Sequence, residues 1–114
     1  MGKHLRVKKN ADALVVHFLD RDIHAELAIM GLGQELYAVV ARPDCLKLVL
    51  NFSGVDFLSS AMLGKAVTVM KMMAEKNGVL RLCEMCPNVR LVFKHTCLDR
   101  ILDIRETEAD AIGQ

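Results

Sequence analysis

One stretch, from Leu46 to Asn77, constrains the fold of this chain more than any other. It begins with a largely apolar run, continues through a short loop and two adjacent serines, and ends in a long segment of helical periodicity. The apolar residues at its start do not alternate with polar ones, so the pattern predicts a strand over 46–52 that is buried on both faces. The stretch therefore predicts a strand, a loop and a helix in succession, with any functional side chains at the junction.

The segment after the two serines has the spacing of an amphipathic helix. Asn77 and Gly78 form a dipeptide that ends helices in the left-handed conformation. Met72 or Val69 is expected to face outward as adaptable contact surface. The stripe expected to face the core consists of Leu63, Ala66, Val67, Met70 and Ala74.

Strand and helix patterns alternate along the rest of the chain. Gly31 and Gly33 are expected to weaken the first turn of one helix, so that it is firm only from about Leu32 onward. This order of elements predicts an α/β sandwich with a mostly parallel sheet. The expected elements are a hairpin over 5–8 and 13–19, a helix over 28–41, strands over 79–83 and 101–104, and short helices over 88–95 and 106–112.

Length and charge limit the classes of function. A chain of 114 residues fits one domain, spanning 1–114, with enough apolar content for a single core. The formal net charge is +1 and the signs are interspersed, so we expect no binding to nucleic acid or anionic lipid. The N-terminus lacks the apolar segment of a secretory signal, and no apolar run approaches membrane-spanning length. We therefore expect a cytoplasmic protein with no membrane contact.

The cysteines offer the sharpest competing interpretation. Cys83 and Cys86 have the spacing of a redox pair and precede a helix, whose N-terminus lowers the pKa of a nearby thiol. No aromatic residue flanks the pair, and the order of elements does not suit a thioredoxin. We therefore expect reduced structural cysteines and keep a thiol redox protein as an alternative. Cys97 and His95 lie near the pair, but the spacing matches no standard zinc site, so we expect no metal and no cofactor.

The adjacent serines, Ser59 and Ser60, lie at the start of the predicted helix. A serine there is typically an N-cap, whose side chain accepts a bond from a backbone N–H and contributes about 1 kcal/mol. A nucleophilic serine would require a base, and the Gly-x-Ser-x-Gly pattern of serine hydrolases is absent. We therefore expect no serine hydrolase. The same helix N-terminus also favours an anion.

The residues from Val49 to Gly64, VLNFSGVDFLSSAMLG, resemble the signature of STAS domains, the anti-sigma factor antagonist family. The resemblance extends over most of the chain and implies the STAS fold, a small mixed and mostly parallel sheet of about four to five strands packed by about four helices. It also implies that Ser60 occupies the position that a partner kinase phosphorylates. The chain departs from the family's switch proteins at Ser59, where they usually carry an aspartate, at Met62 and at Asn51.

The resemblance implies a non-catalytic interaction switch, so we expect that the chain is not an enzyme. Its partners would be an anti-sigma factor with serine kinase activity, which uses ATP, and a serine phosphatase that resets Ser60. A dianion at Ser60 must be desolvated when a partner docks over it, so the unmodified protein binds and the phosphorylated protein is released. Val55 is expected to add apolar surface around Ser60. The expected partner-binding residues are Asp56, Phe57, Leu58, Ser59 and Met62.

A second interpretation keeps the same fold without phosphorylation. The chain would then be a STAS subunit of a signalling or transporter-associated assembly, with Ser60 acting only as a cap. A weak homodimer is compatible with either interpretation.

Overall fold

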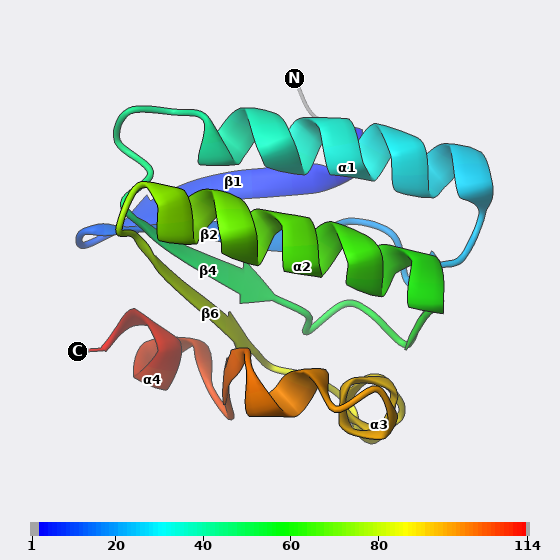
Figure 1. Ribbon diagram of the computed structural model, residues 1–114. Helices are drawn as coiled ribbons and strands as arrows, with labels where there is room; N and C mark the ends of the chain where they lie inside the picture. The colour runs from blue at the N-terminus through cyan, green and yellow to red at the C-terminus, as the bar shows by residue number, and fades with distance from the viewer. Residues whose placement is uncertain (1–2, 114) are drawn as a thin grey trace.

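The computed structural model describes residues 3–113, and it alternates strands and helices after an opening hairpin (Figure 1). The elements are β1 (Leu5–Asn10), β2 (Ala13–Phe18), β3 (Asp22–Ile23), α1 (Glu26–Val40), β4 (Lys47–Asn51), β5 (Phe57–Leu58), α2 (Ser60–Glu75), β6 (Val79–Cys83), α3 (Pro87–His95), a 3-10 turn (Leu98–Arg100), β7 (Asp103–Arg105) and α4 (Glu108–Ile112).

Five strands form the main sheet in the order β1-β2-β4-β6-β7. The hairpin strands β1 and β2 are antiparallel, and every other neighbouring pair is parallel. The predicted mixed α/β architecture with a mostly parallel sheet is therefore confirmed. Two further short strands, β3 and β5, pair with each other in a separate parallel ribbon.

Helices cover both faces of the sheet. Helices α1 and α2 lie side by side over one face, while α4 lies on the other side (Figure 1). Leu48 and Leu50 of β4 belong to the core beneath α1 and α2, and Val49 packs in a second cluster with Ile112 of α4. All three β4 residues are fully buried, which confirms the prediction of a strand buried on both faces.

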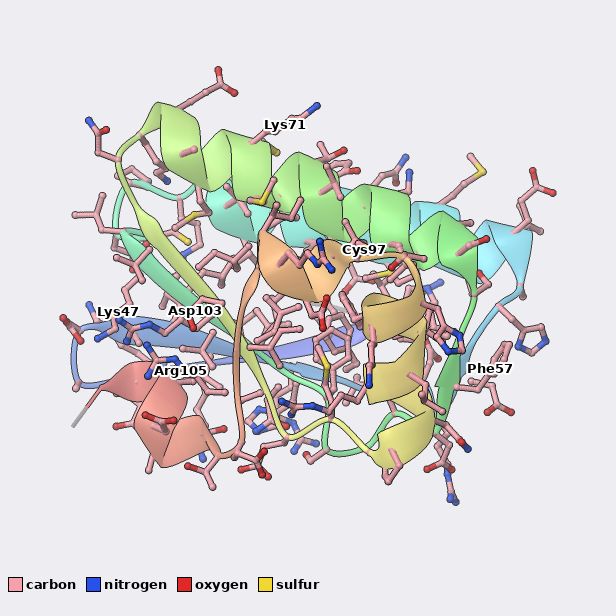
Figure 2. All side chains as sticks on the ribbon, turned by 60° about the horizontal axis from the view of Figure 1, so that its bottom comes forward. Lys47, Phe57, Lys71, Cys97, Asp103 and Arg105 are labelled. Carbon is pink, nitrogen blue, oxygen red and sulfur yellow. The ribbon has the colours of Figure 1, made fainter. Side chains whose placement is uncertain are left out.

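The last helix is held to the sheet by cations at its C-terminal end. Arg81 Nη1 donates to the Ala111 carbonyl at 3.0 Å, and Lys47 Nζ donates to the Ile112 carbonyl. Figure 2 shows Lys47 beside this helix. Positive charge near the last carbonyls stabilises a helix C-terminus, so these two residues fix the segment that covers the second core cluster.

Helix α1 begins earlier than predicted and is regular from Glu26 onward. A Cβ atom on Gly31 would lie 3.0 Å from Nε2 of His4, and one on Gly33 would lie 3.1 Å from Cδ of Lys65. The glycines therefore allow close approach of neighbouring segments. This packing offsets the helix-propensity cost of about 1 kcal/mol per glycine, which is why the expected weak first turn is wrong.

Helix α2 buries a stripe rotated from the predicted one. Val69 is fully buried, so the expectation that it faces outward is wrong. Val67 and Met70 are half-buried and Ala74 is exposed. The helix is apolar around much of its circumference, so its packing against α1 and the sheet, not its periodicity, selects the inner face. The buried residues are Met62, Leu63, Ala66, Val69 and Met73.

Smaller differences occur at the chain's turns and C-terminal elements. Asn77 adopts the predicted left-handed conformation with φ of 55°. The last strand lies at Asp103–Arg105 instead of 101–104, and the last helix begins at Glu108 instead of Glu106. Thr107 explains the later helix start, because its hydroxyl accepts a hydrogen bond from the Asp110 backbone N–H at 3.1 Å. No helix within residues 3–113 is both long enough and apolar enough to cross a membrane.

Candidate functional site

The loop between β4 and α2 is anchored by a segment that precedes α1. The Asp56 backbone N–H donates to the Arg21 carbonyl at 2.8 Å, and the Ser59 N–H donates to the Ile23 carbonyl at 2.8 Å. These bonds continue the β3–β5 ribbon, in which Ile23 lies opposite Leu58. The start of α2 therefore has a defined position relative to the start of α1. The sequence did not predict this ribbon, because a two-residue strand carries no periodic signal.

An exposed ion pair reinforces the ribbon. Arg21 Nη2 and Nε lie 2.7 Å and 3.0 Å from Asp56 Oδ2. The hydrogen bond and the charge of Asp56 raise the pKa of Arg21 above its ordinary value. Because both side chains are exposed, the pair contributes little to stability. Its effect is to orient the Asp56 carboxylate, so a partner that binds this carboxylate must displace or include Arg21.

The two serines have different environments. Ser59 has the extended backbone of an N-cap residue, with φ of −85° and ψ of 164°. Its side chain makes no capping bond, and its buried Oγ has no hydrogen-bond partner in the described part of the chain. The predicted side-chain cap at the start of α2 is therefore wrong. Ser60 is the first helical residue and is exposed. Of the two serines, Ser60 is therefore the one that a partner or a kinase could reach.

A pair of cap substitutions tests this difference. Ser59→Ala is expected to leave the free energy of unfolding almost unchanged, because its hydroxyl makes no bond that would be lost. Thr107→Ala removes a side-chain cap from α4 and should lower the free energy of unfolding by about 1 kcal/mol. Urea titrations followed by circular dichroism measure both. A larger loss for Ser59→Ala than for Thr107→Ala would contradict the assigned caps.

Some of the residues expected to form apolar surface around Ser60 are buried. Val55, Leu58 and Met62 are each 1 % exposed, so that expectation is wrong for all three, and no partner reaches them in this conformation. Strand alternation explains β5: Leu58 points into the core while its neighbour Phe57 points outward. Phe57 is 48 % exposed, and Figure 2 shows it at the outer margin of the molecule.

Further exposed apolar residues lie at the start of α1, where the sequence analysis placed no site. Leu27 is 83 % exposed and Met30 is 52 % exposed. The His24 ring meets the Phe57 ring edge-on at 6.1 Å between centroids, which links the α1 segment to the β5 loop. Leu27 and Met30 are three residues apart and lie off the buried stripe of α1. This spacing is the sequence pattern that could have predicted a shared exposed face for the two residues. A cavity of about 440 Å³ separates the two helix starts and is lined by His24, Glu26, Ile29, Met30, Ala61 and Lys65.

The cysteine pair lacks the environment of a redox centre. Cys83 is fully buried in β6, and burial, with the nearby charges of Glu84 and Glu108, raises the pKa of its thiol to about 12. Cys86 is half-buried and its thiol donates to the Val55 carbonyl at 3.5 Å. A reactive thiol requires a lowered pKa, so Cys83 is unsuited to nucleophilic chemistry. All four cysteines are free thiols.

The raised pKa of Cys83 predicts alkaline destabilisation. In the unfolded chain this thiol ionises at its ordinary pKa of 9.0, whereas the folded thiol stays protonated to about pH 12. The unfolded state therefore loses a proton that the folded state keeps, and stability falls as pH rises between these values. Urea midpoints between pH 8 and pH 11 measure the effect. Cys83→Ala should show a shallower fall; an identical fall in both proteins would contradict the assignment.

These features define a class: a small α/β fold in which the β3–β5 ribbon anchors the start of α2, and α2 presents one exposed serine, Ser60. Residues 4–111 match the STAS domain family, and the chain belongs to that family. A search of curated proteins finds no match to the chain. Within the described residues, no group of three His, Cys, Asp or Glu side chains is placed to hold a metal ion.

Solved structures with the same fold confirm the predicted STAS architecture. The chain is similar to an anti-sigma-factor antagonist (STAS) domain protein from Planctomyces limnophilus, with 23 % identity, a TM-score of 0.86, and coverage of 94 % of this chain and 93 % of the other. A putative anti-sigma factor antagonist from Thermotoga maritima has 23 % identity and a TM-score of 0.82, covering 95 % and 91 %. The Bacillus cell fate determinant SpoIIAA in its phosphorylated form has 17 % identity and a TM-score of 0.69, covering 95 % and 96 %.

Proposed function

We propose that this protein is an anti-sigma factor antagonist whose binding to its partner is switched off by phosphorylation of Ser60. The observation that carries the proposal is the exposure of Ser60 at the first position of α2, directly after the β5 strand whose Phe57 ring is also exposed. The partner would be an anti-sigma factor with serine kinase activity that uses ATP, and a serine phosphatase would reset the switch. The chain itself would act by binding and not by catalysis.

The start of α2 suits a phosphate on Ser60. The N–H groups of a first helical turn carry partial positive charge, and the first turn of α2 contains no acidic residue. Lys65 lines the adjacent cavity, but its ammonium group lies 5.8 Å from the centroid of the Tyr37 ring, so the helix N-terminus is the feature that favours the phosphate. Phosphorylation would therefore leave the fold intact, and its consequence would fall on the partner.

Apolar surface near Ser60 makes a phosphate unfavourable for a docked partner. Phe57, Leu27 and Met30 are exposed apolar residues of β5 and of the start of α1. A partner that covers them would also remove a neighbouring dianion from water, which costs several kcal/mol unless a cation pairs with it. Asp56 and Ser59 would complete the contact surface, with Leu58 and Met62 supporting it from the core.

The proposed switch is tested by comparing a negative charge at Ser60 with the same charge elsewhere on α2. Ser60→Asp is expected to weaken binding to the anti-sigma factor at least about tenfold, or 1.4 kcal/mol, because the carboxylate must be desolvated on docking. Ser60→Ala should bind like the unmodified protein, and Thr68→Asp adds the same charge at an exposed site two turns further along α2. Isothermal titration calorimetry measures all three. Equal affinity of Ser60→Asp and Thr68→Asp would refute the switch.

Ser59 favours the alternative of a STAS subunit in a signalling or transporter-associated assembly. It stands where the family's switch proteins usually carry an aspartate, and its hydroxyl makes no bond within residues 3–113. Intact-mass measurement after incubation with ATP and the cognate kinase separates the two proposals. The switch requires one added phosphoryl group that Ser60→Ala abolishes and Ser59→Ala retains, whereas the subunit adds none.

A further inference from the structure

Strand β1 is an open edge of the main sheet. Within residues 3–113 it pairs with β2 alone, and Figure 1 shows it behind α1 as the outermost strand. The Leu19 N–H donates to the His4 carbonyl at 2.8 Å. In an antiparallel pair, every second residue of a strand bonds to the neighbouring strand, so in the β1–β2 register Arg6 and Lys8 bond to β2. The N–H and C=O groups of Leu5 and Val7 therefore point away from β2, as do those of Lys9.

A groove runs beside the β1 edge. If another strand paired with β1, half of the side chains of that strand would enter this groove. The groove has a volume of about 560 Å³ and lies between β1 and the C-terminal half of α1. Leu19 at its end is 45 % exposed. Added strands alternate side chains between the two faces of a sheet, so every second residue of a new strand would enter the groove. Its apolar lining consists of Leu5, Val7, Leu19, Ala38 and Val39, and Arg6 and Glu35 complete it. The Glu35 carboxylate accepts a hydrogen bond from the His4 N–H at 3.1 Å, so the groove itself favours apolar side chains and not carboxylates.

The same edge carries exposed positive charge. Arg6, Lys8 and Lys9 are exposed, and none forms an ion pair with another residue in 3–113. Leu5 and Val7 pack with the core beneath α1, so strand alternation directs Arg6 and Lys8 to the opposite face. The remaining side chains of a new strand would lie beside these two cations.

Charge also decides what pairs with the edge. A second copy of the chain, pairing β1 with β1, would bring Arg6 and Lys8 of both copies close together, and like charges on neighbouring strands are destabilising. Basic residues on an edge strand commonly prevent such self-association. An acidic strand reverses the sign of this interaction, because each carboxylate would face a cation that has no other partner.

We propose that the β1 edge binds an extended acidic segment of another protein as an additional strand of the main sheet. Backbone hydrogen bonds to Leu5, Val7 and Lys9 would hold the segment, its apolar residues would fill the groove beside α1, and its carboxylates would face Arg6 and Lys8. The recognised segment alternates apolar and acidic residues. This mode of binding uses the sheet edge and not the start of α2, so it is independent of Ser60.

Peptide binding read by amide exchange tests the proposal directly. The probe is a seven-residue peptide of alternating valine and glutamate, and the control is its valine and lysine counterpart. The glutamate peptide is expected to slow hydrogen exchange at the amides of Leu5, Val7 and Lys9, while Arg6 and Lys8, already bonded to β2, change little. Protection at other sites, equal binding of both peptides, or no protection at any amide would overturn the proposal.

Substitutions on the edge separate charge from backbone pairing. The double variant Arg6→Glu/Lys8→Glu should weaken binding of the glutamate peptide by on the order of tenfold or more, and it should bind the lysine peptide. Lys71→Glu/Lys94→Glu, a matched reversal at exposed sites on α2 and α3, should do neither. Figure 2 shows Lys71 pointing to solvent. Equal effects of the two reversals would show non-specific attraction and overturn the assigned edge.

A proline substitution tests the backbone bonds. Val7→Pro removes an N–H that faces the open side without removing a bond to β2, a substitution that edge strands tolerate. It should abolish peptide binding, and so should Lys9→Pro, while circular dichroism and thermal melting confirm folding. A folded proline variant that binds the glutamate peptide like the unmodified protein would exclude strand addition. Concentration-dependent self-association through the same amides would assign the edge to a second copy instead.

Discussion

Replacing Phe52 with alanine is expected to lower the free energy of unfolding by about 3–5 kcal/mol. Phe52 follows β4 and is 1 % exposed. Its ring centroid lies 4.7 Å from that of Phe18 and 6.0 Å from that of Phe93. The ring therefore joins β2, the end of β4 and α3, and its loss leaves a cavity that three separate elements must close. Urea unfolding followed by circular dichroism measures the change.

Phe57→Ala is the matched control for this stability effect. The substitution removes the same ring from a position that is 48 % exposed, and it should change the free energy of unfolding by no more than about 0.5 kcal/mol. Similar losses for the two variants would show that the aromatic cluster around Phe52 does not stabilise the core as described. Because Phe57→Ala is expected to remain folded, its binding to a partner can also be measured.

Phe57→Ala should reduce affinity for the anti-sigma factor by about 2 kcal/mol, or roughly thirtyfold. An exposed aromatic ring on the strand that leads into α2 is the type of side chain that dominates a protein interface once a partner desolvates it. Isothermal titration calorimetry with the purified partner measures the change.

Leu46→Ala provides the control for binding. Leu46 is 58 % exposed, but it precedes β4, whereas Phe57 follows that strand, so the two side chains lie toward opposite ends of the strand. Its truncation should leave affinity unchanged. An equal loss in both variants would contradict an interface centred on the β5 loop.

Local sequence predicted the elements whose signals are strong and continuous. The β4 strand was predictable because its apolar residues do not alternate, and the hairpin because two β-rich runs flank a short turn. Ser59 and Ser60 were correctly placed at the start of a helix. Phe57 and Asp56 were named as contact candidates, and both are exposed.

The inner face of α2 was not predictable in the same way. Apolar residues surround much of this helix, so several stripes satisfy the periodicity, and the neighbours of the helix choose among them. Val69 is buried for that reason. Met62 and Leu58 were expected at the surface because they flank Ser60 in sequence, yet residues adjacent in sequence point in different directions on a helix or strand.

By itself, the sequence determined the α/β class, the family signature and the junction at which a serine meets a helix. Only the tertiary structure decided which of the two serine hydroxyls is exposed: the Ser59 backbone is bonded to Ile23 of β3 and its hydroxyl is buried, whereas Ser60 is exposed. It also brought Leu27, Met30 and Phe57 to one end of the molecule and left β1 as an uncovered basic edge. These features depend on contacts between segments distant in the chain, and such contacts leave no local pattern from which they could be predicted.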